Sequence, residues 1–206
     1  MPEGPEIWIL SEAINKHYHS EKTRAYGKHL FIIKDKLNWS FGLTGKVHIN
    51  DDNQLIKIYS GWLYGDQQPF EDHSKDLGID WLTGSETDIK NEISTWVKSK
   101  KKLAGLLLDQ TKICGIGVAW GSEILFKAGL RPELKACDQN LSKLLEILLS
   151  VRENIKLQYS VLLTEANSKQ FVNEWFDNLY KIRKMSIYKK GTKIDVLGRS
   201  WWINSI

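Results

Sequence analysis

The sequence contains few cysteines and no long apolar run, and both absences exclude classes of protein. The two cysteines, Cys114 and Cys137, form no C-x-x-C pair, which excludes a zinc finger built from such pairs. A disulfide between them is not excluded, but nothing favours one. No apolar run is long enough to span a bilayer, and the N-terminal residues lack the hydrophobic core of a signal peptide. We expect no metal, no cofactor and no membrane partner, in a protein of the cytosol or the nucleus.

The chain does contain many tryptophans and a small excess of positive charge. Its 206 residues are 42% hydrophobic and 26% charged, which is typical of a globular protein of one or two domains. The net charge of +4 is compatible with a polyanionic partner without establishing one. The nine tryptophans are assigned to the core by default, with stacking on nucleic-acid bases as the alternative.

Hydrophobic spacing divides the chain into a strand-rich first part and a helix-rich second part. Helical spacing predicts helices at 6–18, 86–98, 103–109, 118–128, 141–157 and 171–181. Apolar runs rich in β-branched and aromatic residues predict strands at 28–34, 39–49, 54–60, 185–188, 193–197 and 198–203. Because strands give way to helices near residue 82, we expect an α+β protein with domains at 1–82 and 83–206.

The first six residues, Met-Pro-Glu-Gly-Pro-Glu, combine a potential nucleophile with two carboxylates. Removal of Met1 would leave Pro2 with a free secondary amine, which titrates near about pH 8, far below a lysine. Such an amine can attack an electrophilic carbon and form a Schiff base. Glu3 could move protons beside it, and Glu6 falls in the first helical turn, where the helix dipole favours negative charge. The alternative is an ordinary solvated helix start.

Basic residues at three other places are candidate nucleic-acid contacts. The turn Gly115-Ile-Gly117 precedes a helix, an arrangement that binds phosphate, and Lys112 belongs to a group of lysines nearby in the sequence. Lys28 begins the first predicted strand. Arg199 belongs to a C-terminal tail that alternates basic and aromatic residues, as suits a nucleic-acid backbone. The alternatives are a glycine turn without a ligand, an edge-strand lysine and solvated basic faces.

Several short motifs resemble those of the formamidopyrimidine-DNA glycosylase and endonuclease VIII family of base-excision enzymes. The start Met1–Ile7 resembles endonuclease VIII, and Leu103–Gln110, Gly115-Ile-Gly117 and Ser122–Pro132 resemble the family's helix–two-turn–helix motif. The remaining similar segments are Gly27-Lys-His-Leu30, Phe41-Gly-Leu-Thr-Gly45, Leu77-Gly-Ile-Asp80, Ile187-Tyr-Lys-Lys-Gly191 and Gly198-Arg-Ser-Trp201. They occur in the family's order, so the resemblance covers the whole chain.

The resemblance implies a fold, an activity and residue roles. The fold is an N-terminal helix with an antiparallel β-sandwich, then a helix–two-turn–helix domain that ends in a zincless β-hairpin. The activity is that of a bifunctional glycosylase and abasic-site lyase, a monomer acting on damaged DNA, with oxidised pyrimidines favoured. The implied catalytic residues are Pro2, Glu3, Glu6 and Lys28. The implied DNA contacts are Leu43, as a wedge beside the flipped nucleotide, and Gly117 and Arg199, at phosphates.

The chain also departs from the family pattern. Lys28 comes much earlier than in typical members, which predicts a shortened N-terminal domain. Val118 replaces the usual asparagine after Gly-Ile-Gly, and no void-filling arginine is found around residues 59–66. One alternative is a catalytically degraded relative that only binds damaged or abasic DNA, because binding surfaces could outlast a degraded active site; a retained Met1 would be its sign. Another is a helix–turn–helix-type protein acting on RNA or the ribosome, with a preference for single strands.

Overall fold

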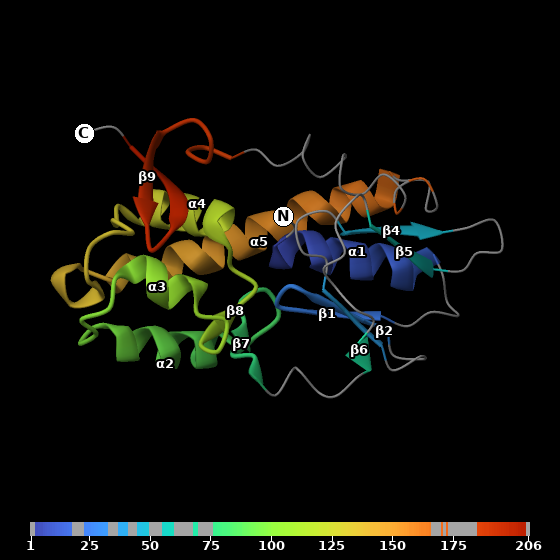
Figure 1. The fold of residues 1–206 in the computed structure, drawn as a ribbon, viewed down its shortest axis with the longest axis horizontal. Coiled ribbons are helices and arrows are strands. Elements are labelled where there is room, and N and C mark those ends of the chain that lie inside the picture. The colour runs from blue at the N-terminus through green and yellow to red at the C-terminus, as the bar shows by residue number, and fades with distance from the viewer. Residues whose placement is uncertain are drawn as a thin grey trace. The chain divides into compact units, whose positions relative to one another are not determined.

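A computed structural model describes residues 3–17, 23–32, 37–40, 45–49, 55–59, 68–69, 76–165, 170, 172 and 185–204 (Figure 1). The chain divides into two compact units, of which the first contains Met1–Lys75 and Lys156–Arg183. The second contains Asp76–Ile155 and Lys184–Ile206. Each unit is formed from two separate stretches of chain, and the domain boundary near residue 82 stays a prediction.

Helices and small sheets alternate along the described chain. The helices are α1 (Gly4–His17), α2 (Glu86–Trp96), α3 (Leu103–Leu108), α4 (Val118–Ala128) and α5 (Ser142–Glu165), with a 3-10 turn, η2, at Ala136–Asp138. The strands are β1 (Thr23–Tyr26), β2 (His29–Ile32), β3 (Leu37–Ser40), β4 (Gly45–Ile49), β5 (Leu55–Tyr59), β6 (Gln68–Pro69), β7 (Ile79–Asp80), β8 (Ile113–Cys114), β9 (Thr192–Val196) and β10 (Arg199–Ile203). The predicted α+β mixture is confirmed, and the β-sandwich stays a prediction. Of the helices described, none is both long and apolar enough to cross a membrane.

Helix α1 begins at Gly4 because its first turn is capped from within. The Glu6 carboxylate accepts the Glu3 N–H through Oε2 at 2.8 Å, and the Glu3 carbonyl accepts the Ile7 N–H at 3.2 Å. A glutamate at the third helical position that bonds the N-cap N–H is one half of a capping box. Pro5 is tolerated in this turn because its missing N–H would have no partner within the helix. The helix therefore begins two residues before the predicted start.

The buried face of α1 packs against the first hairpin of the first unit (Figure 1). Asn15 on this helix bonds both backbone groups of Thr23: its Nδ2 donates to the carbonyl at 2.9 Å, and its Oδ1 accepts the N–H at 2.7 Å. The Ser11 and Thr23 hydroxyl oxygens lie 3.0 Å apart in the buried interface. These side-chain bonds fix β1, a strand that the apolar pattern did not predict, to the helix.

The strands of the first unit belong to two separate sheets. One has the order β1-β2-β3-β6, and the other contains β4 and β5. The predicted strand at 28–34 begins one residue late, at His29, because residues 27 and 28 form the hairpin turn. The single predicted strand at 39–49 is wrong: its two ends belong to β3, which pairs with β2, and to β4, which pairs with β5. The predicted strand at 54–60 is found as β5.

In the second unit, parallel pairing of β7 with β8 joins the segment before α2 to the turn before α4. Gly78 lies so close to the Lys112 backbone that a Cβ atom at this position would overlap the Lys112 carbonyl. Asp80 ends β7, because its Oδ1 accepts the N–H groups of two following residues at 2.8 and 2.9 Å. The motif Leu77-Gly-Ile-Asp80 therefore has a structural explanation in a close backbone approach followed by a side-chain-capped turn.

The predicted helices of the second unit are found with small changes at their ends. Helix α4 matches its prediction at both ends, and Gly129, with φ of +70°, stops it as expected. Helix α5 continues well beyond its predicted end at Leu157. Its last turns belong to the first unit, where Lys16 donates from Nζ to the Leu163 carbonyl at 2.7 Å. Of the helix predicted at 171–181, only Val172 is described, and it is helical.

Strands β9 and β10 pair antiparallel, and β10 packs against α4. Their two-residue turn has positive φ at Leu197 and Gly198, as a type I′ turn requires. Trp201 on β10 is fully buried, and its ring lies 3.0 Å from the point where a Cβ of Gly121 would be. Glycine at this position of α4 therefore makes room for the indole, and β10 is held to the helix by apolar packing.

The strand predicted at 185–188 is wrong. This segment forms a turn, and its backbone N–H groups donate to the carboxylate of Glu123 on α4. The apolar residues Met185 and Ile187 that suggested a strand are buried in the turn. The bonds to a buried side chain more than sixty positions away replace those that a neighbouring strand would make.

Candidate functional site

Two carboxylates are buried at the start of α1. Glu3 and Glu6 are 4% and 3% exposed, which is unusual for glutamate. The Glu6 carboxylate fixes the Glu3 backbone through the capping bond described above. The side chain of Glu3 therefore leaves a backbone held in place by the helix cap. Buried carboxylates at a fixed position are the groups that enzymes use to move protons.

The other predicted residues of the first unit have different outcomes. Lys28 does not lie on a strand as predicted, but in the two-residue turn between β1 and β2, where it is half-buried. Gly27 before it has φ of +58°, so glycine at the first turn position allows this tight connection. Pro2 and Leu43 lie outside the described residues. The structure thus describes three of the four residues that were predicted to be catalytic.

The connection between α3 and α4 is shaped by the side chain of Gln110. Its Nε2 donates to the Leu108 and Ile116 carbonyls, each at 3.1 Å, and its Oε1 accepts the Gly115 N–H at 2.9 Å. Gly115 adopts φ of +91°, a conformation that favours glycine. One amide side chain thus holds the turn that leads into α4, and Gly117 becomes the N-cap of that helix, with no side-chain cap bond.

Lys112 lies in this connection and is engaged by Glu92 on α2. Its Nζ donates to Oε1 of Glu92 at 2.8 Å, and the same oxygen accepts the Trp96 indole N–H at 2.8 Å. Partial burial by itself would raise the pKa of Glu92. The bonds from Lys112 and Trp96, together with the lysine charge, outweigh burial and lower the pKa below its ordinary value of 4.5. The ammonium of this predicted DNA contact is therefore held by an internal partner.

We expect this ion pair to make a pH-dependent contribution to stability. A carboxylate with a lowered folded-state pKa stabilises the fold above its unfolded pKa, and the contribution is lost as pH falls through the folded value. As pH falls below 4.5, the ordinary pKa of glutamate, the free energy of unfolding of Glu92→Gln should therefore decrease less steeply than that of the wild type. The difference should be on the order of 0.5 kcal/mol, because the pair is partly exposed. Urea unfolding across this pH range measures it, and identical slopes would contradict the expectation.

The C-terminal turn and hairpin supply the remaining basic residues. Arg199 is exposed at the first position of β10, opposite Val196. Lys189 is exposed in the turn that follows the Glu123 bonds, with its ammonium 5.7 Å from the centre of the Tyr188 ring. The Tyr188 ring in turn meets the Trp202 ring edge to face, with centroids 4.5 Å apart. Charged and aromatic groups are thus combined on this part of the second unit, as the sequence predicted.

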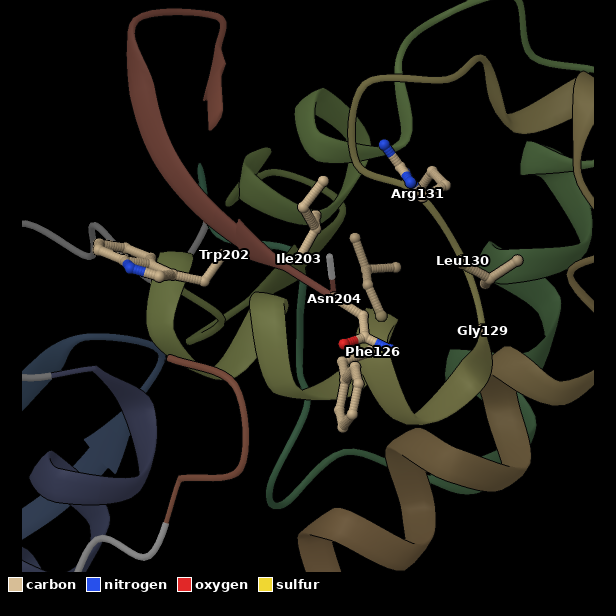
Figure 2. A pocket seen from close by; sticks show the side chains of 8 residues that line it. Phe126, Gly129, Leu130, Arg131, Trp202, Ile203 and Asn204 are labelled. Atoms are coloured by element: carbon tan, nitrogen blue, oxygen red, sulfur yellow. The ribbon is translucent and has the colours of Figure 1, made fainter. Parts of the chain in front are cut away.

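A separate pocket of about 260 Å³ lies at the C-terminal end of α4 (Figure 2). Its lining is mostly apolar and includes Phe126, Leu130 and Ile203. Arg131 is its charged member, and its guanidinium is engaged by Glu133 at 2.6 Å. The pocket is at the opposite end of α4 from the Gly117 N-cap and contains none of the predicted site residues.

The described site residues fall into two groups, one in each unit. Glu3, Glu6 and Lys28 belong to the first unit, whereas Lys112, Gly117 and Arg199 belong to the second. Within the described ranges, no cluster of three or more histidine, cysteine, aspartate or glutamate side chains could hold a metal ion.

Comparisons with known proteins agree with this architecture. No protein-family model matches the sequence. Over 103 residues, half of this chain and 37% of the relative, the chain is 29% identical to a formamidopyrimidine-DNA glycosylase of Shewanella denitrificans. Over 46 residues, 22% of this chain and 17% of the relative, it is 48% identical to the Mycoplasma pneumoniae protein of that name. The matched segments therefore span about a third or less of these curated relatives.

Solved structures extend the similarity to nearly the whole chain. The MutM (Fpg) protein of Thermus thermophilus superposes with a TM-score of 0.69 over 98% of this chain and 97% of that chain, at 16% identity. Wild-type Lactococcus lactis Fpg, in complex with DNA containing an oxidised pyrimidine, superposes with a TM-score of 0.69 over 98% of both chains, at 15% identity. The chain has the formamidopyrimidine-DNA glycosylase fold. The predicted resemblance to this family is confirmed.

Two residues that hold turns in this formamidopyrimidine-DNA glycosylase fold were not predicted from the sequence. Gln110 was noted only as part of a motif, and its role in holding the Gly115 turn follows from its three bonds. Glu123 was not singled out at all. The sequence did hold a signal for Glu123: it is a charged residue on the buried face of α4, between Ser122 and Ile124. A carboxylate without partners would cost free energy there, so bonding partners were to be expected.

Proposed function

We propose that this protein is a bifunctional DNA glycosylase and abasic-site lyase of base excision repair, acting as a monomer on oxidised bases, with pyrimidines favoured. The proposal rests on one observation above others. Glu3, the residue after Pro2, is buried and held at the start of α1 by the Glu6 cap. An N-terminal amine beside a fixed, buried carboxylate combines a nucleophile with a proton-transfer group. The fold and the relatives' names support the same chemistry.

In the proposed reaction, Met1 is removed and the Pro2 nitrogen attacks C1′ of the damaged nucleotide. The nitrogen–carbon bond forms as the glycosidic bond breaks, and Glu3 takes the proton from the attacking nitrogen. The base leaves with the bonding electrons and takes up a proton from solvent. Glu3 gives a proton to the ring oxygen, so that the sugar opens and the nitrogen lone pair forms an iminium. Loss of a C2′ proton then expels the 3′ phosphate and nicks the strand. Lys28 and Glu6 assist at the sugar and phosphate.

The second unit would hold the DNA backbone. The N-terminus of α4, at Gly117, would face a phosphate, because the helix dipole favours negative charge there. Exposed Arg199 would add a charge-assisted contact. Lys112 would reach a phosphate only by sharing its ammonium with Glu92 or leaving it. Leu43 would fill the space left by the extruded nucleotide, because the target base must leave the stack.

Borohydride trapping tests the covalent chemistry. The protein is incubated with a duplex that carries an abasic site or an oxidised pyrimidine, and borohydride reduces any Schiff base to a stable protein–DNA adduct. We expect an adduct with both duplexes that disappears in Pro2→Gly. Pro5→Ala is the matched control, because it changes the other proline of the hexapeptide without touching the amine. N-terminal mass spectrometry shows whether Pro2 is the first residue.

The possible outcomes separate the candidate functions. An adduct on abasic DNA alone would mean a lyase whose base-removal pocket is lost or recognises another lesion. No adduct from a protein that starts at Pro2 would favour the binding-only relative. A Pro2→Gly variant that still forms the adduct would overturn the assignment of the nucleophile.

A further inference from the structure

Glu123 is a buried carboxylate with no place in the proposed chemistry. It is 2% exposed and lies on α4, yet its bonds reach the turn that precedes β9. Oε2 accepts the Ser186 N–H at 2.8 Å, and Oε1 accepts the N–H groups of Ile187 and Tyr188 at 2.6 and 2.9 Å. Three consecutive backbone donors thus converge on one side chain. Hydrogen bonds to a charged acceptor are the strong ones, and a buried carboxylate requires such partners.

The residue directly after these donors has a strained backbone. Lys189 adopts φ of +62°, in the left-handed region that lysine rarely occupies. The N–H groups of Lys190 and Gly191 both bond the Ile187 carbonyl at 2.9 Å, and the Lys190 ammonium donates to the Met185 carbonyl at 2.6 Å. The turn is therefore closed on itself, and the exposed Lys189 side chain leaves from its tip. Such a conformation persists only where its surroundings enforce it.

We infer that Glu123 is a positioning residue for DNA binding: its carboxylate fixes the Ser186–Tyr188 backbone to α4 and so aims Lys189 at a DNA phosphate. The inference rests on the proposed function, because it assumes that the second unit binds DNA. It deepens that function by naming what orders the turn. Helix α4 would then have two roles in DNA binding. Its Gly117 N-cap would bind a phosphate, and Glu123 would orient the Lys189 ammonium.

Hydrogen exchange tests the clamp without DNA. In the wild type, the Ser186, Ile187 and Tyr188 amides should be protected, because each is bonded to a buried oxygen. In Glu123→Gln one acceptor oxygen becomes an NH₂ group that faces an N–H donor, so protection should fall at these amides and not along α5. Unchanged protection in a folded Glu123→Gln protein would overturn the inference.

A double-mutant cycle tests whether Glu123 acts through Lys189. Affinity for an abasic-site duplex should fall about tenfold in Glu123→Gln, the loss expected for one charge-assisted bond, although the change makes the protein more positive. In Lys189→Ala, affinity should fall, and the slope of log affinity against log salt concentration should decrease in magnitude by about one, because one counterion fewer is released. Adding Glu123→Gln to Lys189→Ala should cost little more, because both changes remove the same contact. Full additivity would mean a purely structural Glu123 and would overturn the inference.

Matched controls separate position from charge and from folding. Glu133→Gln makes the same charge change in the same unit, and Lys127→Ala removes an exposed lysine from the other end of α4; both should bind DNA as the wild type does. A Lys189→Ala variant that binds normally would overturn the inference even if Glu123→Gln fails to fold. If the wild type itself does not bind the abasic duplex, the proposed function fails. If the wild type binds and Glu123→Gln binds equally well, only the inference fails.

Discussion

The Glu3→Gln variant will release an oxidised base at least about 100-fold more slowly than the wild type, because a carboxamide can neither take the proton from the attacking Pro2 nitrogen nor give one to the ring oxygen. Its affinity for an abasic-site duplex should stay within about twofold, which is a free-energy difference of about 0.4 kcal/mol. The substitution is nearly isosteric, and the Glu3 backbone keeps its bonds to Glu6 and Ile7. Single-turnover base release, measured beside equilibrium binding, separates the two effects.

Glu12→Gln is the matched control for this experiment. Glu12 lies on the same helix but is exposed, so the same chemical change there should leave base release unaffected. A Glu3→Gln protein that releases base at the wild-type rate would remove Glu3 from the proposed mechanism. A protein that loses DNA binding with unchanged chemistry would place Glu3 in the interface instead.

The Trp201→Ala variant is expected to lose about 3–5 kcal/mol of unfolding free energy, the usual cost of truncating a buried aromatic side chain. Trp201 is fully buried, and its ring rests where Gly121 leaves space on α4. Removing it leaves a cavity between the strand and the helix that the backbone cannot close. Urea unfolding, followed by the fluorescence of the remaining tryptophans, measures the loss.

Trp202→Ala provides the comparison for this prediction. Trp202 is the next residue, but it is half-buried and its main ring partner is Tyr188. Its truncation should cost only about 1 kcal/mol, the size of an aromatic pair. Equal losses from the two substitutions would contradict the view that Trp201 is the main side-chain anchor of the C-terminal hairpin on α4.

Local sequence signals predicted the elements whose ends are decided locally. Helix α4 was predicted at both ends, because its glycines start and stop it. The two strands of the C-terminal hairpin were predicted at 193–197 and 198–203, within one residue of the ends of β9 and β10, although Leu197 and Gly198 form the turn between them. At the start of α1, the spacing of apolar residues predicted a start two residues too late, because the helix start is decided by a capping bond to Glu6. In these cases the information lies within a few positions of the feature.

Errors arose where a distant partner decides the structure. The run at 39–49 looks like one strand, but its ends pair with different strands in separate sheets. The segment at 185–188 has strand-like residues, and a carboxylate on α4 makes it a turn. Of the candidate site, Glu3, Glu6 and the Gly117 turn were proposed from motifs, whereas the partner of Lys112 was not predicted. No sequence feature near Lys112 indicates that its ammonium forms an ion pair with Glu92 on α2.

The division of the chain has a consequence for synthesis. The first unit combines Met1–Lys75 with Lys156–Arg183, so it stays incomplete until the intervening 76–155 stretch has been made. At about 5–20 residues per second, translation of that stretch takes roughly 4–16 seconds. During this interval the apolar face of α1 lacks part of the unit it belongs to. The nascent N-terminal half is thus expected to expose apolar surface until Lys156–Arg183 has been synthesised.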